Sequence, residues 1–224
     1  MRKPISLMNG NLKTNDERVI AMEKCYIICG GPETFDSVRI EEDSYVICAD
    51  SGYDKAISAG ITPELVIGDF DSIKSVPEGV KTIKAPVHKD DTDTMLAIRT
   101  AISEGYKDIT LVSAFSGRMD HSIANLSALC FMSEQGIKGR IIGDSCNAYY
   151  LDETSIMLTP DKNRYLSVFS STETATVTIK GAEYEVENFE MKKSFPIGVS
   201  NEFTNENCVV TVHSGAVYVL TVKK

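Results

Sequence analysis

Residues 45–72 read YVICADSGYDKAISAGITPELVIGDFDS, and this stretch decides the fold class. It contains two short runs, Tyr45–Ala49 and Leu65–Ile67, that are apolar nearly throughout, which is typical of strands covered on both faces. A short helix is predicted between them. An aspartate closely follows each run, Asp50 after the first and Asp69 after the second. The stretch therefore predicts buried strands that alternate with helices and carry acids at their ends.

The same alternation continues in both directions over residues 24–150. Further strands are predicted at Cys25–Cys29, Lys81–Lys84, Ile109–Ser113 and Arg140–Ile142. Helices are predicted at residues 53–59, 92–104 and 120–135. Gly105 and Gly136 follow the last apolar positions of the second and third helices, and a glycine there is a helix-stop signal. We therefore expect an α/β fold with a doubly wound, mainly parallel sheet.

From about residue 153 the pattern changes to short β-type runs separated by turn residues. These runs are Ser155–Leu158, Tyr165–Phe169, Ala175–Ile179, Glu183–Val186, Cys208–His213 and Ala216–Val222. Residues 176–179 alternate polar and apolar side chains, which is typical of a half-buried antiparallel strand. His213–Ala216 is predicted to form a hairpin turn. We expect an α/β domain at residues 1–148, followed by a small antiparallel β-sandwich domain at residues 149–224.

The composition excludes several classes of protein. The chain has 224 residues, 42% of them hydrophobic and 25% charged, as in an ordinary globular protein. A formal net charge of −9 argues against binding to nucleic acid, because duplex binding depends on Lys and Arg. No apolar run approaches the length of a membrane span, and the N-terminus lacks a signal-peptide core. The six cysteines are expected to be buried free thiols, which favours a reducing cytoplasm.

The acidic residues are concentrated in one part of the chain and follow successive strands. Residues 33–93 contain 14 Asp and Glu against 6 Lys and Arg. The acids after predicted strands are Asp50, Asp69, Asp71, Asp90, Asp91, Asp93 and Asp120. A single aspartate at such a position is more often a turn residue or a helix N-cap. Four successive strand ends that meet at one edge of a sheet weaken that explanation.

Carboxylates gathered at one edge need a counter-charge. Two ionised carboxylates about 4 Å apart repel by roughly 4 kcal/mol at an effective dielectric constant of about 20. The predicted ligands are hard oxygens, and the chain has only three histidines and no Cys/His spacing typical of a zinc site. Mg²⁺ is therefore the expected ion, since it binds carboxylates together with the oxygens of a polyphosphate.

Few cationic groups lie near these acids in the sequence. Arg118 follows a glycine, where its guanidinium can bind phosphate oxygens in a bidentate manner. Lys89 precedes the run of aspartates and either neutralises phosphate or is a solvated loop residue. Gly30-Gly31-Pro32, after the first strand, allows a phosphate or base to approach the backbone. The sequence lacks both the Walker-A lysine pattern and the Rossmann glycine spacing.

Several motifs, in their order and spacing, resemble those of the thiamine pyrophosphokinase family over nearly the whole chain. They are Asp50-Ser51-Gly52, Gly68-Asp69-Phe70-Asp71-Ser72, Lys89-Asp90-Asp91-Thr92-Asp93, Gly117-Arg118-Met119-Asp120-His121 with Asn125, and Val199-Ser200-Asn201-Glu202. The resemblance implies transfer of a pyrophosphoryl group from ATP to the hydroxyl of thiamine, giving thiamine diphosphate and AMP. It also implies Mg²⁺ and a homodimer. Each active site would lie between the ATP-binding α/β domain of one subunit and the thiamine-binding β domain of the other.

The resemblance also implies a role for each matching residue. The expected metal ligands are Asp69, Asp71 and Asp93. The expected nucleotide-binding residues are Asp50, Ser51, Gly52, Lys89, Asp90, Arg118 and His121. The expected catalytic residues are Asp71, Asp93, Arg118 and Asp120. The chemistry of the transfer, and not the resemblance, calls for one carboxylate that accepts the proton of the hydroxyl group, and Asp71 is the first candidate among them. The residues expected to contact thiamine are Asp120, Ser200 and Asn201.

The chain departs from the family pattern in two places. Ser116 stands where a second glycine is common, which changes how closely that loop approaches a ligand. The chain has no tryptophan, so no indole can stack on thiamine as it does in some relatives. Either a Tyr or Phe replaces that indole, or the affinity for thiamine is lower.

Two other functions remain open at the level of sequence. A Mg²⁺-dependent phosphohydrolase of the Asp-x-Asp type would use Asp69 as a nucleophile and release inorganic phosphate. A non-catalytic module would bind a nucleotide or thiamine without turnover. The intact set of Asp69, Asp71, Asp93 and Arg118 argues against the second, because a degenerate site would be expected to lose some of these residues.

Overall fold

The computed structural model describes residues 24–34, 38–70, 79–84, 91–115 and 117–224. The α/β half holds β1 (Lys24–Ile28), β2 (Tyr45–Ala49), β3 (Leu65–Gly68), β4 (Lys81–Lys84), β5 (Asp108–Val112) and β6 (Lys138–Ile142). Its helices are α1 (Gly52–Ser58), α2 (Asp93–Ser103) and α3 (Met119–Glu134). All strands and helices predicted for this half are confirmed, with ends shifted by one or two residues.

The β-rich half consists of strands alone in the part of the chain that the structure describes. They are β7 (Cys146–Asp152), β8 (Ser155–Leu158), β9 (Arg164–Ser170), β10 (Thr174–Lys180), β11 (Val186–Lys192), β12 (Asn201–Glu202), β13 (Cys208–Ser214) and β14 (Ala216–Lys223). Sequence patterns predicted six of these strands and missed β7 and β12. The run predicted at Glu183–Val186 is wrong in position, because the strand there begins at Val186.

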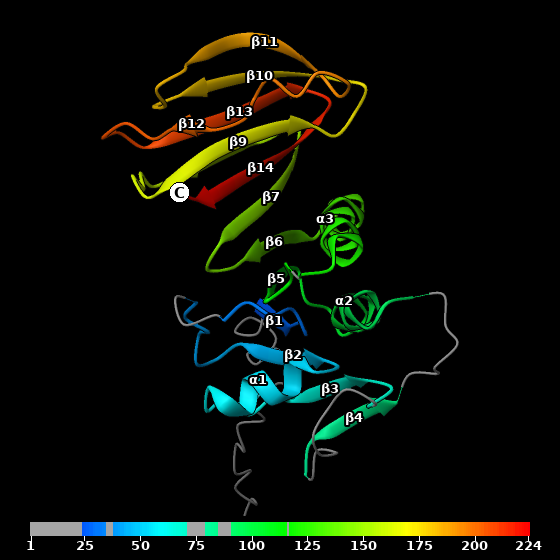
Figure 1. The fold of residues 1–224 in the computed structure, drawn as a ribbon. Coiled ribbons are helices and arrows are strands. Elements are labelled where there is room, and N and C mark those ends of the chain that lie inside the picture. The colour runs from blue at the N-terminus through cyan, green and yellow to red at the C-terminus, as the bar shows by residue number, and fades with distance from the viewer. Residues whose placement is uncertain (1–23, 35–37, 71–78, 85–90, 116) are drawn as a thin grey trace, which may run out of the picture.

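The six strands of the α/β half form a parallel sheet in the order β6-β5-β1-β2-β3-β4. Helix α1 covers one face of this sheet, and α2 and α3 cover the other (Figure 1). Along β1, Cys25 and Ile27 pack in the cluster that contains α2 and α3, whereas Tyr26 and Ile28 pack with Ala56 of α1. Because both faces are covered, the central strands are apolar nearly throughout. This is the doubly wound sheet that the sequence predicts.

The β-rich half continues the same sheet. Strand β7 pairs antiparallel with β6, and β14, β9 and β12 follow, which gives ten strands in one sheet. A second sheet, in the order β11-β10-β13-β8, packs on this extension. Leu166, Val168 and Val219 of the long sheet share a core with Val177 and Val210 of the short one. The predicted α/β-then-β-sandwich fold is therefore confirmed. One layer of the sandwich is nevertheless part of the long sheet. The domain division at residues 148/149 falls inside β7 and stays a prediction.

The hairpin predicted at His213–Ala216 is wrong. Strand β13 belongs to the short sheet and β14 to the long one, so the chain crosses between the two layers at this point instead of turning back along its neighbour. Gly215 makes the crossing possible because its φ is +70°, a left-handed conformation that glycine adopts without steric cost. A side chain there would lie 2.6 Å from Oγ1 of Thr172.

Two smaller expectations concern the thiols and the membrane. All six cysteines are free, and Cys25, Cys29, Cys48 and Cys208 are buried. Among the residues that the structure describes, no helix has the length and apolar character needed to cross a membrane.

Candidate active site

A cavity of about 450 Å³ opens at the carboxyl ends of β1, β2 and β5. From β1 the chain builds the sheet outward to β4 on one side and then returns to add β5 on the other side. Strand β1 therefore marks a switch point of the sheet, and ligands of such sheets bind beyond the carboxyl ends of the strands at that point. The cavity is lined by Cys29, Gly30, Gly31, Pro32, Ala49, Asp50, Ser51, Thr92, Asp93, Thr94, Ala114, Gly117, Arg118, His121 and Asn125.

Two glycines allow the loops around this cavity to pack closely. A side chain at Gly31 would meet the carbonyl oxygens of Ser113 and Phe115 in the loop after β5. A side chain at Gly52 would meet the carbonyl oxygen of Ile28 at the end of β1. Glycine at both positions therefore allows the main chains of neighbouring segments to come into close contact. Gly30, Gly31 and Pro32 also line the cavity, and the expectation that this loop lets a phosphate or base approach the main chain stays a prediction.

Helices α2 and α3 begin at the edge of the cavity. Thr92 caps α2, since its hydroxyl oxygen accepts a hydrogen bond from the N–H of Met95 at 3.2 Å, and Thr92 and Asp93 both line the cavity. Arg118 occupies the N-cap position of α3 and lines the cavity together with His121. The N-terminus of a helix carries partial positive charge and unpaired N–H groups, which favour anions. Two helix ends and a guanidinium thus face one space.

Asp50 and Asp93 bring carboxylates to the same cavity. Asp50 has a φ of 50°, in the left-handed region, where residues other than glycine are uncommon and are often functional. Its N–H donates to the carbonyl oxygen of Ile67 at 2.8 Å, so the loops after β2 and β3 lie side by side. Asp69, one residue beyond β3, is half-buried but is not among the residues that line the cavity.

The donor atoms near the cavity suit Mg²⁺, although no complete metal site is described. Among the described ranges, no group of three or more His, Cys, Asp or Glu side chains could hold a metal ion. Asp71, Lys89 and Asp90 lie outside the described residues. Burial raises the pKa of the Cys29 thiol to about 11, so this sulfur stays protonated at neutral pH and is not a competing soft ligand. The cavity lining includes the carboxylates of Asp50 and Asp93, and Mg²⁺ prefers such oxygen ligands.

Arg118 forms an ion pair with Asp120 at the entrance to α3. Its Nη2 and Nε lie 2.6 Å and 3.2 Å from the two carboxylate oxygens, a bidentate arrangement. This hydrogen bonding lowers the pKa of Asp120 and raises that of Arg118. Both side chains are exposed, and Asp120 is not among the cavity-lining residues. The pair can hold the guanidinium near the cavity until an anion competes for it.

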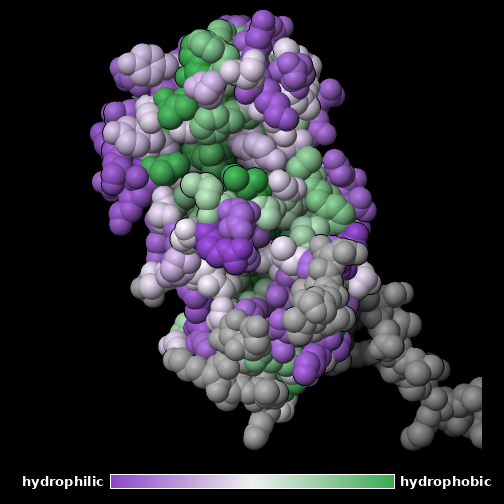
Figure 2. Space-filling model, turned by 45° about the vertical axis from the view of Figure 1, so that its right-hand side comes forward, coloured by the Kyte–Doolittle hydropathy of each residue, from purple (hydrophilic) through white to green (hydrophobic). Residues whose placement is uncertain are grey.

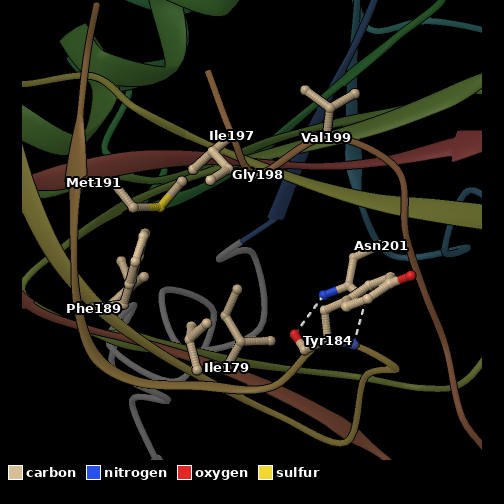
Figure 3. Close-up of a pocket in the computed structure, with 10 residues that line it drawn as sticks. Ile179, Tyr184, Phe189, Met191, Ile197, Gly198, Val199 and Asn201 are labelled. Atoms are coloured by element: carbon tan, nitrogen blue, oxygen red, sulfur yellow. Dashed lines mark hydrogen bonds between the residues drawn. The ribbon is translucent and has the colours of Figure 1, made fainter. Parts of the chain in front are cut away.

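A second pocket of about 420 Å³ lies in the β-rich half. It is lined by Val177, Ile179, Tyr184, Val186, Phe189, Met191, Ile197, Gly198, Val199 and Asn201. Figure 3 shows these side chains around an open space, with Tyr184 and Asn201 together on one side. The apolar residues come from β10, β11 and the segment before β12. Figure 2 shows hydrophobic residues gathered in the upper part of the molecule, which the β-rich half occupies in Figure 1.

Asn201 holds the main chain of Tyr184 in place. Its Nδ2 donates to the carbonyl oxygen of Tyr184 at 2.8 Å, and its Oδ1 accepts from the N–H groups of Tyr184 and Glu202, both at 2.9 Å. None of these three bonds involves the phenol group of Tyr184, a residue that is 71% exposed and lines the pocket. The acceptor atom of Asn201 is thus already engaged, and its second Nδ2 hydrogen is the group that remains for a ligand among the described contacts.

Some of the predicted site residues line one of the two pockets. The cavity at the strand ends brings together Asp50, Ser51, Asp93, Arg118 and His121, whereas Gly52, Asp69 and Asp120 do not line it. Asn201 lines the apolar pocket, and its neighbour Ser200 has a φ of 59° and donates its N–H to Oγ of Ser167 at 3.1 Å. Sequence analysis missed the other pocket residues, because alternating apolar positions on strands indicate a core and do not distinguish it from a pocket.

Comparison with known proteins identifies the family. The model for the thiamin pyrophosphokinase catalytic domain matches residues 38–141, and that for the thiamin pyrophosphokinase vitamin B1 binding domain matches residues 153–219. Thiamine pyrophosphokinase of Bacillus subtilis (strain 168) is 27% identical over 192 residues, which cover 81% of this chain and 90% of that protein.

Solved structures agree with this result. The crystal structure of the Bacillus subtilis thiamine pyrophosphokinase has a TM-score of 0.81 at 23% identity, over 90% of this chain and 99% of that one. A thiamin pyrophosphokinase family protein from Enterococcus faecalis has a TM-score of 0.74 at 26% identity, with the same coverage of both chains. These matches favour neither a phosphohydrolase nor a non-catalytic module. The chain belongs to the thiamine pyrophosphokinase family.

Proposed function

We propose that this protein transfers the pyrophosphoryl group of ATP to the hydroxyl oxygen of thiamine, giving thiamine diphosphate and AMP. One observation carries the proposal. The cavity at the switch point combines two helix N-termini, a guanidinium and two carboxylates, which together suit a metal-bound polyphosphate. Residues 153–219 match the family model for the vitamin B1 binding domain, which supports thiamine as the second substrate.

On the nucleotide side, each group has a distinct role. The N–H groups at the start of α2 and α3 would bind phosphate oxygens, and Arg118 would leave Asp120 to pair with the more highly charged polyphosphate. The predicted ligands Asp69, Asp71 and Asp93 would hold Mg²⁺, and Asp50, which also lines the cavity, would lie beside the nucleotide. When bound, Mg²⁺ would neutralise charge that develops on the phosphate oxygens.

On the thiamine side, the apolar pocket would take the aromatic rings. Thiamine carries a cationic thiazolium, and the exposed ring of Tyr184 offers a face for stacking and for cation–π attraction. Tyr184 thereby takes the place of the tryptophan that the chain lacks. The remaining N–H of Asn201 can donate to a ring nitrogen, and Ser200 lies beside it in the chain.

The transfer itself is a displacement at the β-phosphorus of ATP. The thiamine hydroxyl oxygen forms a bond to that phosphorus, the bond to the α,β-bridging oxygen breaks, and AMP departs. The hydroxyl proton passes to a carboxylate, for which Asp71 is the predicted acceptor. The protein contributes mainly by holding both substrates in line and by neutralising charge.

We further propose a homodimer with active sites between subunits, in a cytoplasmic setting that suits six free thiols. The nucleotide cavity and the apolar pocket belong to different halves of one chain (Figure 1), so a second subunit would bring a pocket to each cavity. Light scattering should give twice the chain mass. Asp93→Asn protein is mixed with a Tyr184→Ala, Asn201→Ala double variant and assayed at a thiamine concentration well below the KM of the double variant. The mixture should show about a quarter of wild-type activity, through the one intact site of each mixed dimer, and more than either variant alone. No restoration after verified subunit exchange would contradict shared sites.

The direct test supplies the purified protein with ATP, Mg²⁺ and thiamine and separates the products by chromatography. AMP and thiamine diphosphate should form in equal amounts. ADP, or inorganic phosphate released without consumption of thiamine, would overturn the proposal and favour another phosphoryl-transfer activity.

A further inference from the structure

The loop after β1 forms one wall of the nucleotide cavity, and its position depends on Glu33. Residues 29–32 of this loop line the cavity, and Glu33 follows them directly. The main-chain carbonyl oxygen of Glu33 accepts two hydrogen bonds, one from Nζ of Lys55 at 2.7 Å and one from Oγ of Ser113 at 2.8 Å. Two different elements, α1 and the end of β5, therefore hold the same carbonyl group.

The loop is also tied to the connection between β6 and β7. Oγ of Ser145 donates to the carboxylate of Glu33, and Oγ1 of Thr34 donates to Oδ2 of Asp144 at 2.6 Å. Gly31 adds a main-chain bond, since its N–H donates to the carbonyl oxygen of Ser113 at 3.0 Å. The wall is thus fixed by side chains from three separate parts of the fold.

Lys55 contributes a cationic side chain to this set. It projects from α1, whose first turn follows the cavity residues Asp50 and Ser51, and its ammonium group ends on a neutral carbonyl oxygen. Burial lowers its pKa, an effect that the nearby Glu33 carboxylate opposes. The side chain is partly removed from water, and its hydrogen bond links the loop after β1 with helix α1.

Lys55 acts on the cavity only through the loop. It is not among the described residues that line the cavity, so it does not face the ligand directly. We infer that Lys55 is a positioning residue that holds the loop of residues 30–34 in the shape that receives the nucleotide. The inference rests on the proposed function for the identity of the ligand, ATP. Because this loop is already ordered before binding, less conformational entropy is lost when the nucleotide binds.

The test compares three variants by the KM values for ATP and thiamine. Lys55→Met keeps the aliphatic stem and removes the donor, and the KM for ATP should rise about tenfold, as expected for a lost charge-assisted hydrogen bond. The KM for thiamine and kcat should change less than about threefold. Lys55→Arg retains donors and should restore most of the affinity for ATP. Lys81→Met, which removes an exposed lysine paired with Glu104, is the matched control and should behave as wild type.

Hydrogen exchange provides a readout that does not depend on activity. In Lys55→Met the amides of Gly30, Gly31, Glu33 and Thr34 should exchange faster than in wild type, and addition of ATP should slow them again. An unchanged KM for ATP in Lys55→Met, or equal losses for ATP and thiamine that Lys55→Arg does not rescue, would overturn the inference. Failure of the proposed function is distinguishable, because the wild type itself would then form no thiamine diphosphate.

Discussion

The two pockets of this chain are built in different ways. The nucleotide cavity is assembled from strand ends, helix N-termini and charged side chains at a switch point of the parallel sheet. The apolar pocket is assembled from strand faces and one connecting segment, with Tyr184 and Asn201 as its polar edge. The first places charge where a polyphosphate would lie, and the second offers contact area to a flat, cationic heterocycle. Under the proposed function, the α/β half would therefore carry the phosphoryl transfer, and the β-rich half would mainly bind thiamine.

The largest effect is expected from a carboxylate in the nucleotide cavity. Asp93→Asn removes a proposed metal ligand but leaves the Thr92 cap of α2, so the protein should fold and lose activity by about 100-fold to 1,000-fold. Initial rates of thiamine diphosphate formation measure this loss. Asp91→Asn, which changes a carboxylate bound to Arg99 outside the cavity, is the control. Equal activity in the two variants would remove Asp93 from the site.

A glycine tests how tightly the loops around the cavity are packed. Gly31→Ala places a methyl group against the carbonyl oxygens of Ser113 and Phe115, and the free energy of unfolding should fall by about 2 kcal/mol. The affinity for ATP should fall with it. Gly117→Ala is the matched control, since Gly117 also lines the cavity but no atom lies within 4 Å of its added Cβ. Denaturant unfolding that shows no difference between these variants would contradict the close packing.

A smaller effect is expected in the apolar pocket. Tyr184→Ala leaves the main-chain bonds to Asn201 intact and removes only the ring, so the KM for thiamine should rise roughly tenfold while kcat changes little. Tyr184→Phe should remain close to wild type, because the ring face carries the interaction. Phe195→Ala removes an exposed ring that does not line the pocket and serves as the control. A kcat effect without a KM effect would assign Tyr184 a different role.

The smallest effect is a pH-dependent change in stability at the loop after β1. Burial raises the pKa of Glu33 above its ordinary value, so its contribution to stability is full when the carboxyl is protonated and is lost as pH rises through the folded-state pKa. Glu33→Gln should therefore stabilise the protein at pH 7 by less than about 1 kcal/mol. The gain should vanish near pH 4. Urea unfolding at both pH values, with Glu173→Gln as an exposed control, measures the difference; a larger gain at pH 4 would reverse the assignment.

The sequence predicts that charged residues gather at the carboxyl edge of the sheet, because they lie at the ends of strands and the starts of helices. Asp50 directly follows β2, Asp93 is the first residue of α2 and Arg118 directly precedes α3, and parallel strands bring such positions to one edge. The apolar pocket is different, since Phe189 and Met191 alternate along a strand as core residues do. Tyr184 precedes that strand, and only the fold places it beside Asn201, 17 residues later.

Sequence patterns also do not predict how the chain passes from one sheet to the other. His213–Ala216 has the composition of a hairpin turn, but the hydrophobic faces of β13 and β14 bury against each other across the sandwich, so the strands join different sheets. Strand β7 was missed because its pattern merges with that of β6, from which it follows after a short turn. Local composition specifies a turn here without specifying which partner each strand takes.

The most direct test of the division between the two halves is a crossed calorimetric titration of Asp93→Asn and Tyr184→Ala with Mg²⁺-ATP and with thiamine. We predict that Asp93→Asn weakens binding of Mg²⁺-ATP and leaves thiamine binding near wild type, and that Tyr184→Ala does the reverse. If Tyr184→Ala weakened Mg²⁺-ATP and left thiamine unchanged, the assignment of the two pockets would be contradicted.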